Sequence, residues 1–334
     1  MKAIIPVAGK GTRLRPLTYT QPKPLIPVAG KPILSFIIDQ LLDAGVEEYV
    51  FIIGYLGEKI EEYVCENYPN LKAEFVLQSE RLGSGHALWI AKDYFADAEE
   101  IVVFFGDTII DFDMKSFVEN ESSCLAVKKI EDPWNFGVVE LNSEGKVHQL
   151  IEKPKIPKSD LAMVGIYKIK EVGALINALD FNISRGIKTN EEYPLTDALM
   201  RMVEKEINFD VFSVDNWFNC GVRDVLLETN ATFLDRTGFA SEEIPNLDNS
   251  IIIHPVSIGH DCMIKNSIIG PHVTVGSNVK IKNAILKNSI IGNYTNIKEV
   301  ILQRSVIGND TSITGLRQSL NIGDNTEIDF SNGE

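Results

Sequence analysis

The spacing of hydrophobic residues divides the chain into two regions. Up to about residue 235, short apolar runs alternate with segments in which apolar residues recur every three or four positions. The runs predict buried strands, and the recurring positions predict amphipathic helices. Gly45 is placed to end the first of these helices, which begins near Ile33. We expect strands at 2–7, 48–53, 73–78 and 101–105 and helices at 33–44, 57–67 and 84–95.

Strands that alternate with helices imply a mostly parallel sheet covered on both faces. We therefore predict a three-layer α/β domain over residues 1–240, with a Rossmann-like, mixed and mostly parallel sheet. Ligands bind at the carboxyl ends of the strands in such sheets. A glycine-rich stretch at 8–13, Gln78 and Asp107 all fall at predicted strand ends. This coincidence predicts one site.

After about residue 245 the pattern changes to a repeated aliphatic-glycine pair, at intervals of six residues or near multiples of six. One inward aliphatic residue per short strand, followed by polar turns, is typical of a parallel β-helix. We predict a left-handed, hexapeptide-repeat β-helix over 245–330, with insertions at 283–287 and 314–319. The pairs are Ile258-Gly259, Ile269-Gly270, Val275-Gly276, Ile291-Gly292, Ile307-Gly308 and Ile322-Gly323, with Ile264, Ile281, Ile297, Ile313 and Ile328 between them.

Composition narrows the classes of function. The 334 residues suit two domains, and 44% hydrophobic with 24% charged residues is typical of a soluble globular protein. A net charge of −15 argues against a nucleic acid or an anionic membrane as partner. We expect no signal peptide and no membrane span. The widely spaced cysteines predict reduced thiols and a cytoplasmic location; they are Cys65, Cys124, Cys220 and Cys262.

The glycine-rich stretch has the chemistry of a phosphate site. Gly9 and Gly11 allow close approach of the backbone, so that successive N–H groups can hold a phosphate chain. Arg13 adds a planar cation suited to phosphate oxygens, and Lys23 adds a second positive charge. A tight turn with two solvated cations is the alternative interpretation of the loop alone.

With its flanking residues, this stretch resembles the signature of the sugar-1-phosphate nucleotidyltransferases. That family includes glucose-1-phosphate thymidylyltransferases and uridylyltransferases, mannose-1-phosphate guanylyltransferases and N-acetylglucosamine-1-phosphate uridylyltransferases, and several members carry a β-helix. The resemblance covers nearly the whole chain. The matching segments are 8–32, Gln78 with 82–85, Gly106-Asp107, 136–139, 152–154 and Val164-Gly165.

The resemblance implies a role for each matching residue. The residues near the triphosphate would be Gly9, Gly11, Arg13 and Lys23. Those touching the base would be Gln78 and Gly83, and Asp107 would bind Mg²⁺. Those holding the sugar and its phosphate would be Gly137, Glu152 and Lys153, with Val164 close by. Taken alone, Asp107 could be a loop-capping carboxylate, and Glu152 with Lys153 an exposed ion pair of little energetic weight.

The chemistry accounts for these residue types. A sugar-phosphate oxygen attacks the α-phosphorus in line, and pyrophosphate leaves. Both reactants are anions, so the protein must offset their repulsion and align them. Arg13, Lys23, Lys153 and a magnesium ion would supply the positive charge. The attacking oxygen is already ionised, so no general base is needed. Magnesium keeps several waters, so that one or two protein oxygens suffice.

One position departs from the thymidylyltransferase pattern. Members of that type carry a second metal-binding Asp in a segment that resembles 217–221, where this chain has Asn219. An amide oxygen can bind Mg²⁺ without contributing charge, so the resemblance implies a weaker metal site. The uridylyltransferases have an Asn in a comparable segment. Asp224 is a nearby charged substitute, although we expect it on the following helix.

The resemblance favours dTTP or UTP with glucose-1-phosphate, because an amide such as Gln78 can donate to and accept from the edge of uracil or thymine. One methyl group carries too little energy to separate the two bases by sequence. We expect a homo-oligomer, with the β-helix as interface or allosteric surface. Three alternatives stay open: a regulatory or scaffold subunit that has lost the chemistry; a glycosyltransferase using Asp111 and Asp113; and an acetyltransferase using His254, His260 or His272.

Overall fold

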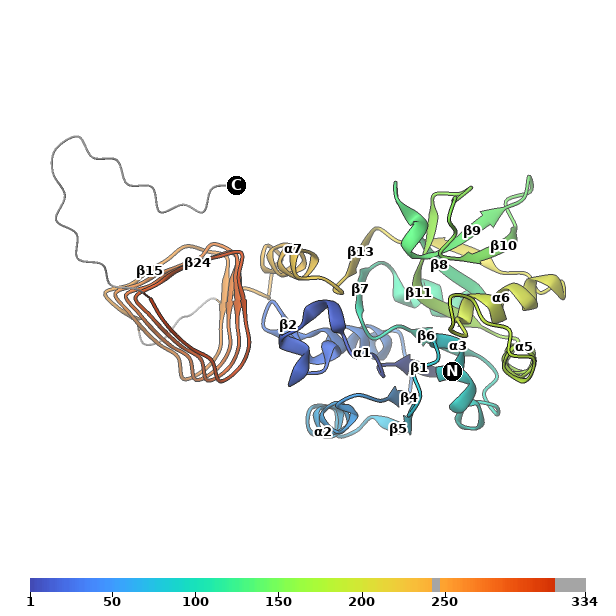
Figure 1. Cartoon of the computed structure of the whole chain (residues 1–334), viewed down its shortest axis with the longest axis horizontal. Helices are drawn as coiled ribbons and strands as arrows, with labels where there is room; N and C mark the ends of the chain where they lie inside the picture. Colours follow the sequence, from blue (N-terminus) through green and yellow to red (C-terminus); the bar gives the residue numbers. More distant parts are fainter. Residues whose placement is uncertain (242–246, 316–334) are drawn as a thin grey trace. The chain divides into compact units, whose positions relative to one another are not determined.

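The computed structural model describes residues 1–241 and 247–315. It forms two compact units, Met1–Phe233 and Leu234–Glu334 (Figure 1). We call them the first and the second unit, and each is described by itself.

The first unit is built on a nine-stranded sheet, in which the order β10-β9-β11-β6-β1-β4-β5 is extended by β8 on β11 and β12 on β8. Seven of the nine strands run in one direction, and β10 and β11 run in the other. The predicted mixed and mostly parallel sheet is therefore confirmed. The strands are β1 (Lys2–Pro6), β4 (Glu48–Ile53), β5 (Lys72–Leu77), β6 (Ile101–Phe104), β8 (Cys124–Lys129), β9 (Gly137–Leu141), β10 (Val147–Glu152), β11 (Leu161–Ile169) and β12 (Asp210–Ser213).

Helices cover the two faces of this sheet (Figure 1). One face packs against α3 (Ser84–Ile90), α5 (Val172–Ser184) and α6 (Leu195–Glu204), and alternate strand residues such as Ile4, Val50 and Val103 meet them in one core. The other side carries α1 (Ile33–Asp43) and α2 (Gly57–Asn67). Only every second strand residue meets this core, because successive side chains of a strand point to opposite faces of the sheet. The two remaining helices are the short α4 (Met114–Glu119) and the longer α7 (Arg223–Leu234).

Local sequence signals place most elements well. The strand at 48–53 and the helix at 57–67 have the predicted bounds, and Gly45 follows α1 at φ +83°. The predicted helix at 84–95 is wrong in its second half, because α3 ends at Ile90 and a 3₁₀ turn spans Lys92–Tyr94. Trp89 and Lys92 on either side of this break both bind Asp180 of α5, so tertiary contacts hold the altered path.

Two small antiparallel pairs lie beside the main sheet. β7 (Thr108–Asp111) pairs with β13 (Asn216–Asn219), so that Asn219 lies opposite Thr108. β2 (Pro27–Val28) pairs with β3 (Lys31–Pro32). Short 3₁₀ turns occupy Thr12–Leu14, Leu17–Tyr19, Lys23–Leu25 and Pro133–Asn135. The first pair matters for the site because it joins two segments about a hundred residues apart.

The second unit is a left-handed β-helix of three parallel sheets, as predicted (Figure 1). Aliphatic side chains fill its interior, and Ile264, Ile281 and Ile297 stack in register. The strands are β14 (Leu247–Asp248), β15 (Ile251–Ile252), β16 (Val256–Ile258), β17 (Met263–Lys265), β18 (Ile268–Ile269), β19 (Val273–Val275), β20 (Lys280–Lys282), β21 (Ile285–Lys287), β22 (Ser289–Ile291), β23 (Asn296–Lys298), β24 (Ile301–Gln303), β25 (Val306–Ile307) and β26 (Ser312–Thr314).

The coils are shorter than three hexapeptides. One turn takes 17 residues from Ile264 to Ile281 and 16 from Ile281 to Ile297. The expected insertion at 283–287 is therefore wrong, since β21 pairs in register with β18 and β24. Glycine is required after the aliphatic residue because the next coil approaches closely: a Cβ on Gly276 would lie 2.3 Å from Asn293 Oδ1.

Several predictions concern residues outside the described part of the chain, namely Ile322-Gly323, Ile328 and residues 316–319 of the second expected insertion. The three histidines of the acetyltransferase alternative lie at or beside turns of the β-helix. His260 bonds Asp261 and His272 bonds Asp235, while His254 is exposed. Within the described residues, no helix is long and apolar enough to cross a membrane.

Candidate functional site

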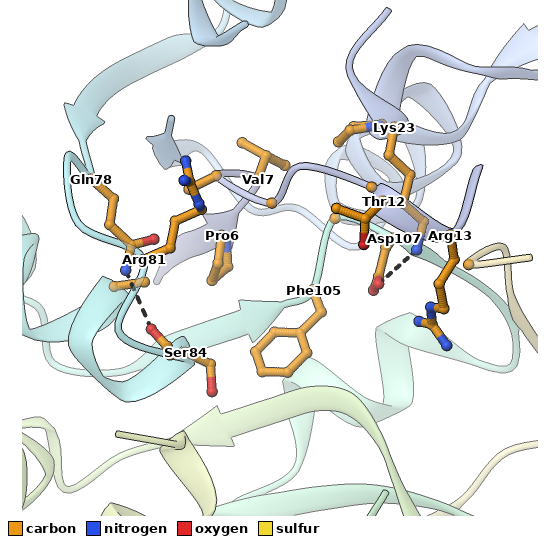
Figure 2. Close-up of a pocket in the computed structure, with 18 of the residues that line it drawn as sticks. Pro6, Val7, Thr12, Arg13, Lys23, Gln78, Arg81, Ser84, Phe105 and Asp107 are labelled. Carbon is orange, nitrogen blue, oxygen red and sulfur yellow. Dashed lines mark hydrogen bonds and ion pairs between the residues drawn. The ribbon is translucent and has the colours of Figure 1, made fainter. Parts of the chain in front are cut away.

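The carboxyl ends of β1, β5 and β6 open into a pocket of about 380 Å³ (Figure 2). Its size is within the usual range for a small-molecule site. The residues predicted to contact the nucleotide all line it, and so does Asp107, the first of the two predicted metal ligands: Gly9, Gly11, Arg13, Lys23, Gln78, Gly83 and Asp107. The remaining predicted residues do not belong to this lining: Gly137, Glu152, Lys153, Val164 and Asn219.

Glycine is needed in the first loop for two different reasons. Gly11 has φ +59°, and a Cβ there would lie 2.9 Å from Thr18 Cγ2. The Thr18 hydroxyl also donates to the Gly11 carbonyl at 2.8 Å, so the loop folds tightly onto residue 18. A Cβ on Gly9, in contrast, would meet nothing within 4 Å. The backbone at Gly9 therefore faces open space that a phosphate could approach.

Lys23 and Asp107 form an ion pair within the pocket (Figure 2), with 2.8 Å between Nζ and Oδ2. Burial alone would raise the pKa of Asp107, but the Lys23 ammonium, a hydrogen bond from Thr108 and the Arg13 charge together lower it. The carboxylate is therefore ionised at neutral pH. A loop-capping carboxylate would accept backbone N–H groups, and among the described residues neither Asp107 oxygen does so.

Asn219 lies next to Asp107 through the β7–β13 pair. The Cys220 N–H donates to the Asp107 carbonyl at 3.2 Å, and Asn219 Oδ1 is buried without a hydrogen-bond partner among the described residues. A Cβ on Gly221 would lie 2.9 Å from that oxygen and 2.7 Å from Arg13 Nη2. The amide oxygen and the guanidinium therefore converge where glycine leaves room for both. Burial raises the pKa of the Cys220 thiol to about 12, so it is no nucleophile.

These oxygens fit a magnesium ion. Mg²⁺ takes a few protein oxygens and completes its octahedron with water and substrate phosphates. A buried carbonyl oxygen without a donor is costly, and a metal or its bound water would satisfy it. Among the residues that the structure describes, no group of three His, Cys, Asp or Glu side chains forms a metal cage. Asp107 and Asn219 thus suit a magnesium ion whose remaining ligands are water and the phosphates of a bound nucleotide.

The opposite end of the pocket is shaped by Gln78. Its amide nitrogen donates to the Gly83 carbonyl at 3.3 Å (Figure 2). The same nitrogen approaches His86 Nδ1 at 3.2 Å, and the two contacts orient the amide. Burial lowers the pKa of His86, so the neutral ring can accept this bond. Because the amide nitrogen of Gln78 is engaged, its Oε1 is left as an acceptor for a ligand. Gly83 has φ +106°, and a Cβ added there would lie 2.6 Å from the Tyr193 carbonyl oxygen.

The predicted sugar residues gather at one end of the β9–β10 hairpin. Glu152 lies opposite Gly137 in the ladder, and the Thr196 hydroxyl donates to Glu152 Oε2 at 2.6 Å. Lys153 lies 3.6 Å from the other Glu152 oxygen and has φ +46°. Glu152 is thus more than a surface ion pair, because Thr196 holds it. Val164 is buried in β11. The next residue, Gly165, lies against the ring of Phe105, which lines the pocket.

Sequence reasoning missed several residues that line the pocket. Thr12, Ser84 and Gly221 lie inside the quoted motifs, and Phe105 precedes Gly106-Asp107, so a signal existed for them. Arg81 likewise precedes the motif at 82–85, whereas Glu192 had no such signal. The two are brought together by tertiary bonds, such as the one from Gly85 N–H to the Tyr193 carbonyl at 2.8 Å.

The alternative pair of acidic residues does not form a shared site. Asp113 caps α4 by accepting from Ser116 N–H at 3.0 Å, and Asp111 accepts from Asn216 Nδ2 at 3.1 Å. Each carboxylate therefore has a local structural role.

Comparisons with known proteins agree with this geometry. Residues 2–236 match the family model described as Nucleotidyl transferase. The bifunctional protein GlmU of Methanocaldococcus jannaschii is 41% identical over 237 residues, which are 71% of this chain and 55% of that protein. The UTP–glucose-1-phosphate uridylyltransferase AglF of Haloferax volcanii is 31% identical over 226 residues, which are 65% of this chain and 89% of that protein.

Among solved structures, a UDP-glucose pyrophosphorylase complexed with UDP-glucose has a TM-score of 0.60 at 24% identity, over 70% of this chain and 99% of the other. This likeness concerns the fold. The chain spans about half the length of the GlmU relatives that it matches. With the family model matched over residues 2–236 and AglF covered almost completely, this chain belongs to the nucleotidyl transferase family, among the sugar-1-phosphate nucleotidyltransferases.

Proposed function

We propose that the chain transfers a nucleotidyl group from a nucleoside triphosphate to a sugar-1-phosphate and releases pyrophosphate. One observation carries the proposal. The Lys23–Asp107 ion pair lies at the end of a glycine-rich loop, beside a buried Asn219 oxygen that lacks a partner among the described residues. A structural ion pair needs no glycine-rich loop and no second oxygen. A phosphate site that also holds a cation needs all three.

The roles follow from charge and position. Backbone N–H groups at Gly9 and Gly11 would hold the triphosphate, and Arg13 would neutralise it from the side of Gly221. Lys23 would bind oxygens of the phosphates that separate. Asp107 and Asn219 would hold Mg²⁺, which when bound supplies positive charge at the reacting phosphate. Lys153 and Glu152 would hold the sugar-phosphate, with Gly137 leaving room beside them and Val164 behind.

The Gln78 amide supports a base with an N–H at its pairing edge. Its nitrogen is already engaged, so its oxygen can accept from N3–H of uracil or thymine. Cytosine and adenine offer an acceptor there and are disfavoured. We propose UTP or dTTP, and the name of AglF supports UTP with glucose-1-phosphate. Gly83 shapes this end of the pocket through its contact with Tyr193.

Three further assignments belong to this proposal. We propose a catalytic domain at 1–240 and a β-helix domain at 245–330. We also propose a homo-oligomer, with the β-helix as its interface. The free thiols of all four cysteines support a cytoplasmic location.

The test is pyrophosphate release from the purified full chain with Mg²⁺. Glucose-1-phosphate, N-acetylglucosamine-1-phosphate and mannose-1-phosphate are each paired with UTP, dTTP, GTP, CTP and ATP. We expect release only when both substrates are present, with UTP or dTTP. No release across the whole grid from folded protein would contradict the proposal and favour the regulatory-subunit alternative.

Replacing Asn219 with aspartate should tighten the metal site. The new carboxylate adds a negative charge next to Asp107, so the half-saturating Mg²⁺ concentration should fall by roughly fivefold, as expected for one added charge near a protein surface. The measurement is a Mg²⁺ titration of pyrophosphate release. Asn70→Asp, in the exposed turn before β5 and outside the pocket lining, is the control and should leave the titration unchanged. Equal Mg²⁺ curves for wild type and the Asn219 variant would remove this residue from the metal site.

A further inference from the structure

The first unit contains another pocket, which shares no lining residue with the nucleotide pocket. It measures about 720 Å³ and lies beside β9, between the loop at 131–134 and the segment at 157–161. Neither the nucleotide nor the sugar-phosphate of the proposed reaction accounts for it. Glu140 of β9 is part of its wall.

Glu140 is an unusual residue for such a wall. It is the fourth of the five residues of β9, and only 9% of it is exposed. Its Oε1 is buried and has no hydrogen-bond partner among the described residues. An unpartnered buried carboxylate oxygen is costly. Such a group is retained where something outside the chain satisfies it.

The charges around Glu140 favour a cation. Glu131, Asp132 and Asp160 also line the pocket, and Lys158 is the one basic residue in its described lining. Lys129 lies 3.0 Å from Asp160 and offsets that carboxylate in part. The pocket therefore keeps an excess of negative charge.

The remaining lining indicates what kind of cation fits. Pro133, Leu141 and Pro157 provide apolar surface, and Trp134, a residue that is 53% exposed, also lines the pocket. Aromatic faces attract ammonium and guanidinium groups. The carboxylates do not gather into a metal cage anywhere in the described residues. An apolar chain that ends in a cationic nitrogen matches the negative charge, the apolar and aromatic lining, and the lack of a metal cage in the described residues.

We propose that this pocket binds a small organic cation, with an ammonium or guanidinium group at Glu140 and an aliphatic chain against Trp134 and its apolar neighbours. The proposal goes beyond the transferase reaction and does not depend on it. Glu140 lies three residues from Gly137 on the same strand, so the ligand would occupy the opposite end of the hairpin from the proposed sugar residues.

The test is titration of the full chain with cadaverine and with agmatine, followed by tryptophan fluorescence and by calorimetry. KCl and MgCl₂ at matched ionic strength are the controls. We expect saturable binding of the amines, and about tenfold weaker binding in Glu140→Gln, the loss typical of a hydrogen bond to a charged group. Glu144→Gln makes the same chemical change in the exposed turn of the same hairpin, where Glu144 pairs with Lys146, and should bind as wild type does.

Asp132→Asn keeps the test valid if Glu140→Gln fails to fold, because Asp132 is exposed. It should weaken binding by about threefold, as expected for an exposed charge pair. Equal affinity in wild type and Glu140→Gln, an equal response to MgCl₂, or no saturation would each overturn the proposal. Self-association that depends on Glu140, without binding of free amines, would also overturn it, since the cation would then belong to a second chain.

Discussion

Replacing Asp107 with alanine is expected to lower the rate of pyrophosphate release by about a thousandfold. The carboxylate is the charged oxygen donor next to the buried Asn219 oxygen, and its lowered pKa keeps it ionised. Without it, the reacting phosphates lose the metal that offsets their charge. Lys23 also loses the partner that lies 2.8 Å from its Nζ. Steady-state pyrophosphate release at saturating Mg²⁺ is the measurement.

The matched control is Asp111→Ala, which removes a carboxylate four residues further along the chain, at the other end of β7. Its activity should stay within about twofold of wild type, because its local bond to Asn216 is remote from the phosphates. Thermal unfolding of both variants separates lost chemistry from lost stability. A folded Asp107→Ala protein with near-normal rate would exclude Asp107 from the metal site, while the opposite ranking of the two variants would favour the glycosyltransferase alternative.

The depressed pKa of Asp107 also sets a direction for pH dependence. A carboxylate whose pKa is lowered in the folded state stays charged above its folded pKa, and it loses its contribution to stability only as the pH falls through that pKa. Asp107 should therefore not titrate between pH 5 and 8. A loss of activity inside that window must come from another group.

Replacing Arg13 with alanine is expected to lower kcat/KM for the nucleoside triphosphate by about a hundredfold. The guanidinium lines the pocket, and among the described residues it forms no hydrogen bond or ion pair, so it is available to a ligand. A Cβ added at Gly221 would lie 2.7 Å from Arg13 Nη2 and 2.9 Å from Asn219 Oδ1, so the guanidinium lies near the Asn219 amide. Loss of this planar cation leaves phosphate charge unbalanced in a partly enclosed site.

Arg15→Ala is the control, since Arg15 stacks on Tyr19 at 4.9 Å and lies outside the pocket lining. It removes the same charge two residues away and should change kcat/KM by less than about twofold. Arg13→Lys should recover only part of the loss, because an ammonium lacks the bidentate fork. If the Arg13 and Arg15 variants were equally impaired, a general effect of net charge would replace the specific contact.

The sequence by itself determined both architectures. A strand or a helix reveals its period within about ten residues, and so the bounds of β4 and α2 follow directly. The β-helix is equally local, because every coil repeats the same inward aliphatic residue. The glycine-rich loop is also continuous in the chain. Gly9, Gly11 and Arg13 could therefore be placed at one strand end without knowing any other contact.

Contacts between distant segments were decided only by the tertiary structure. Asn219 reaches Asp107 because β13 pairs with β7, and Thr196 reaches Glu152 from α6. The Gln78 amide is oriented by His86, which leaves only its oxygen to a ligand. The pocket beside Glu140 likewise forms only because the fold brings residues 131–134 and 157–161 to β9. No local period records such pairings, because hydrogen bonds and burial depend on which segments the whole fold brings together.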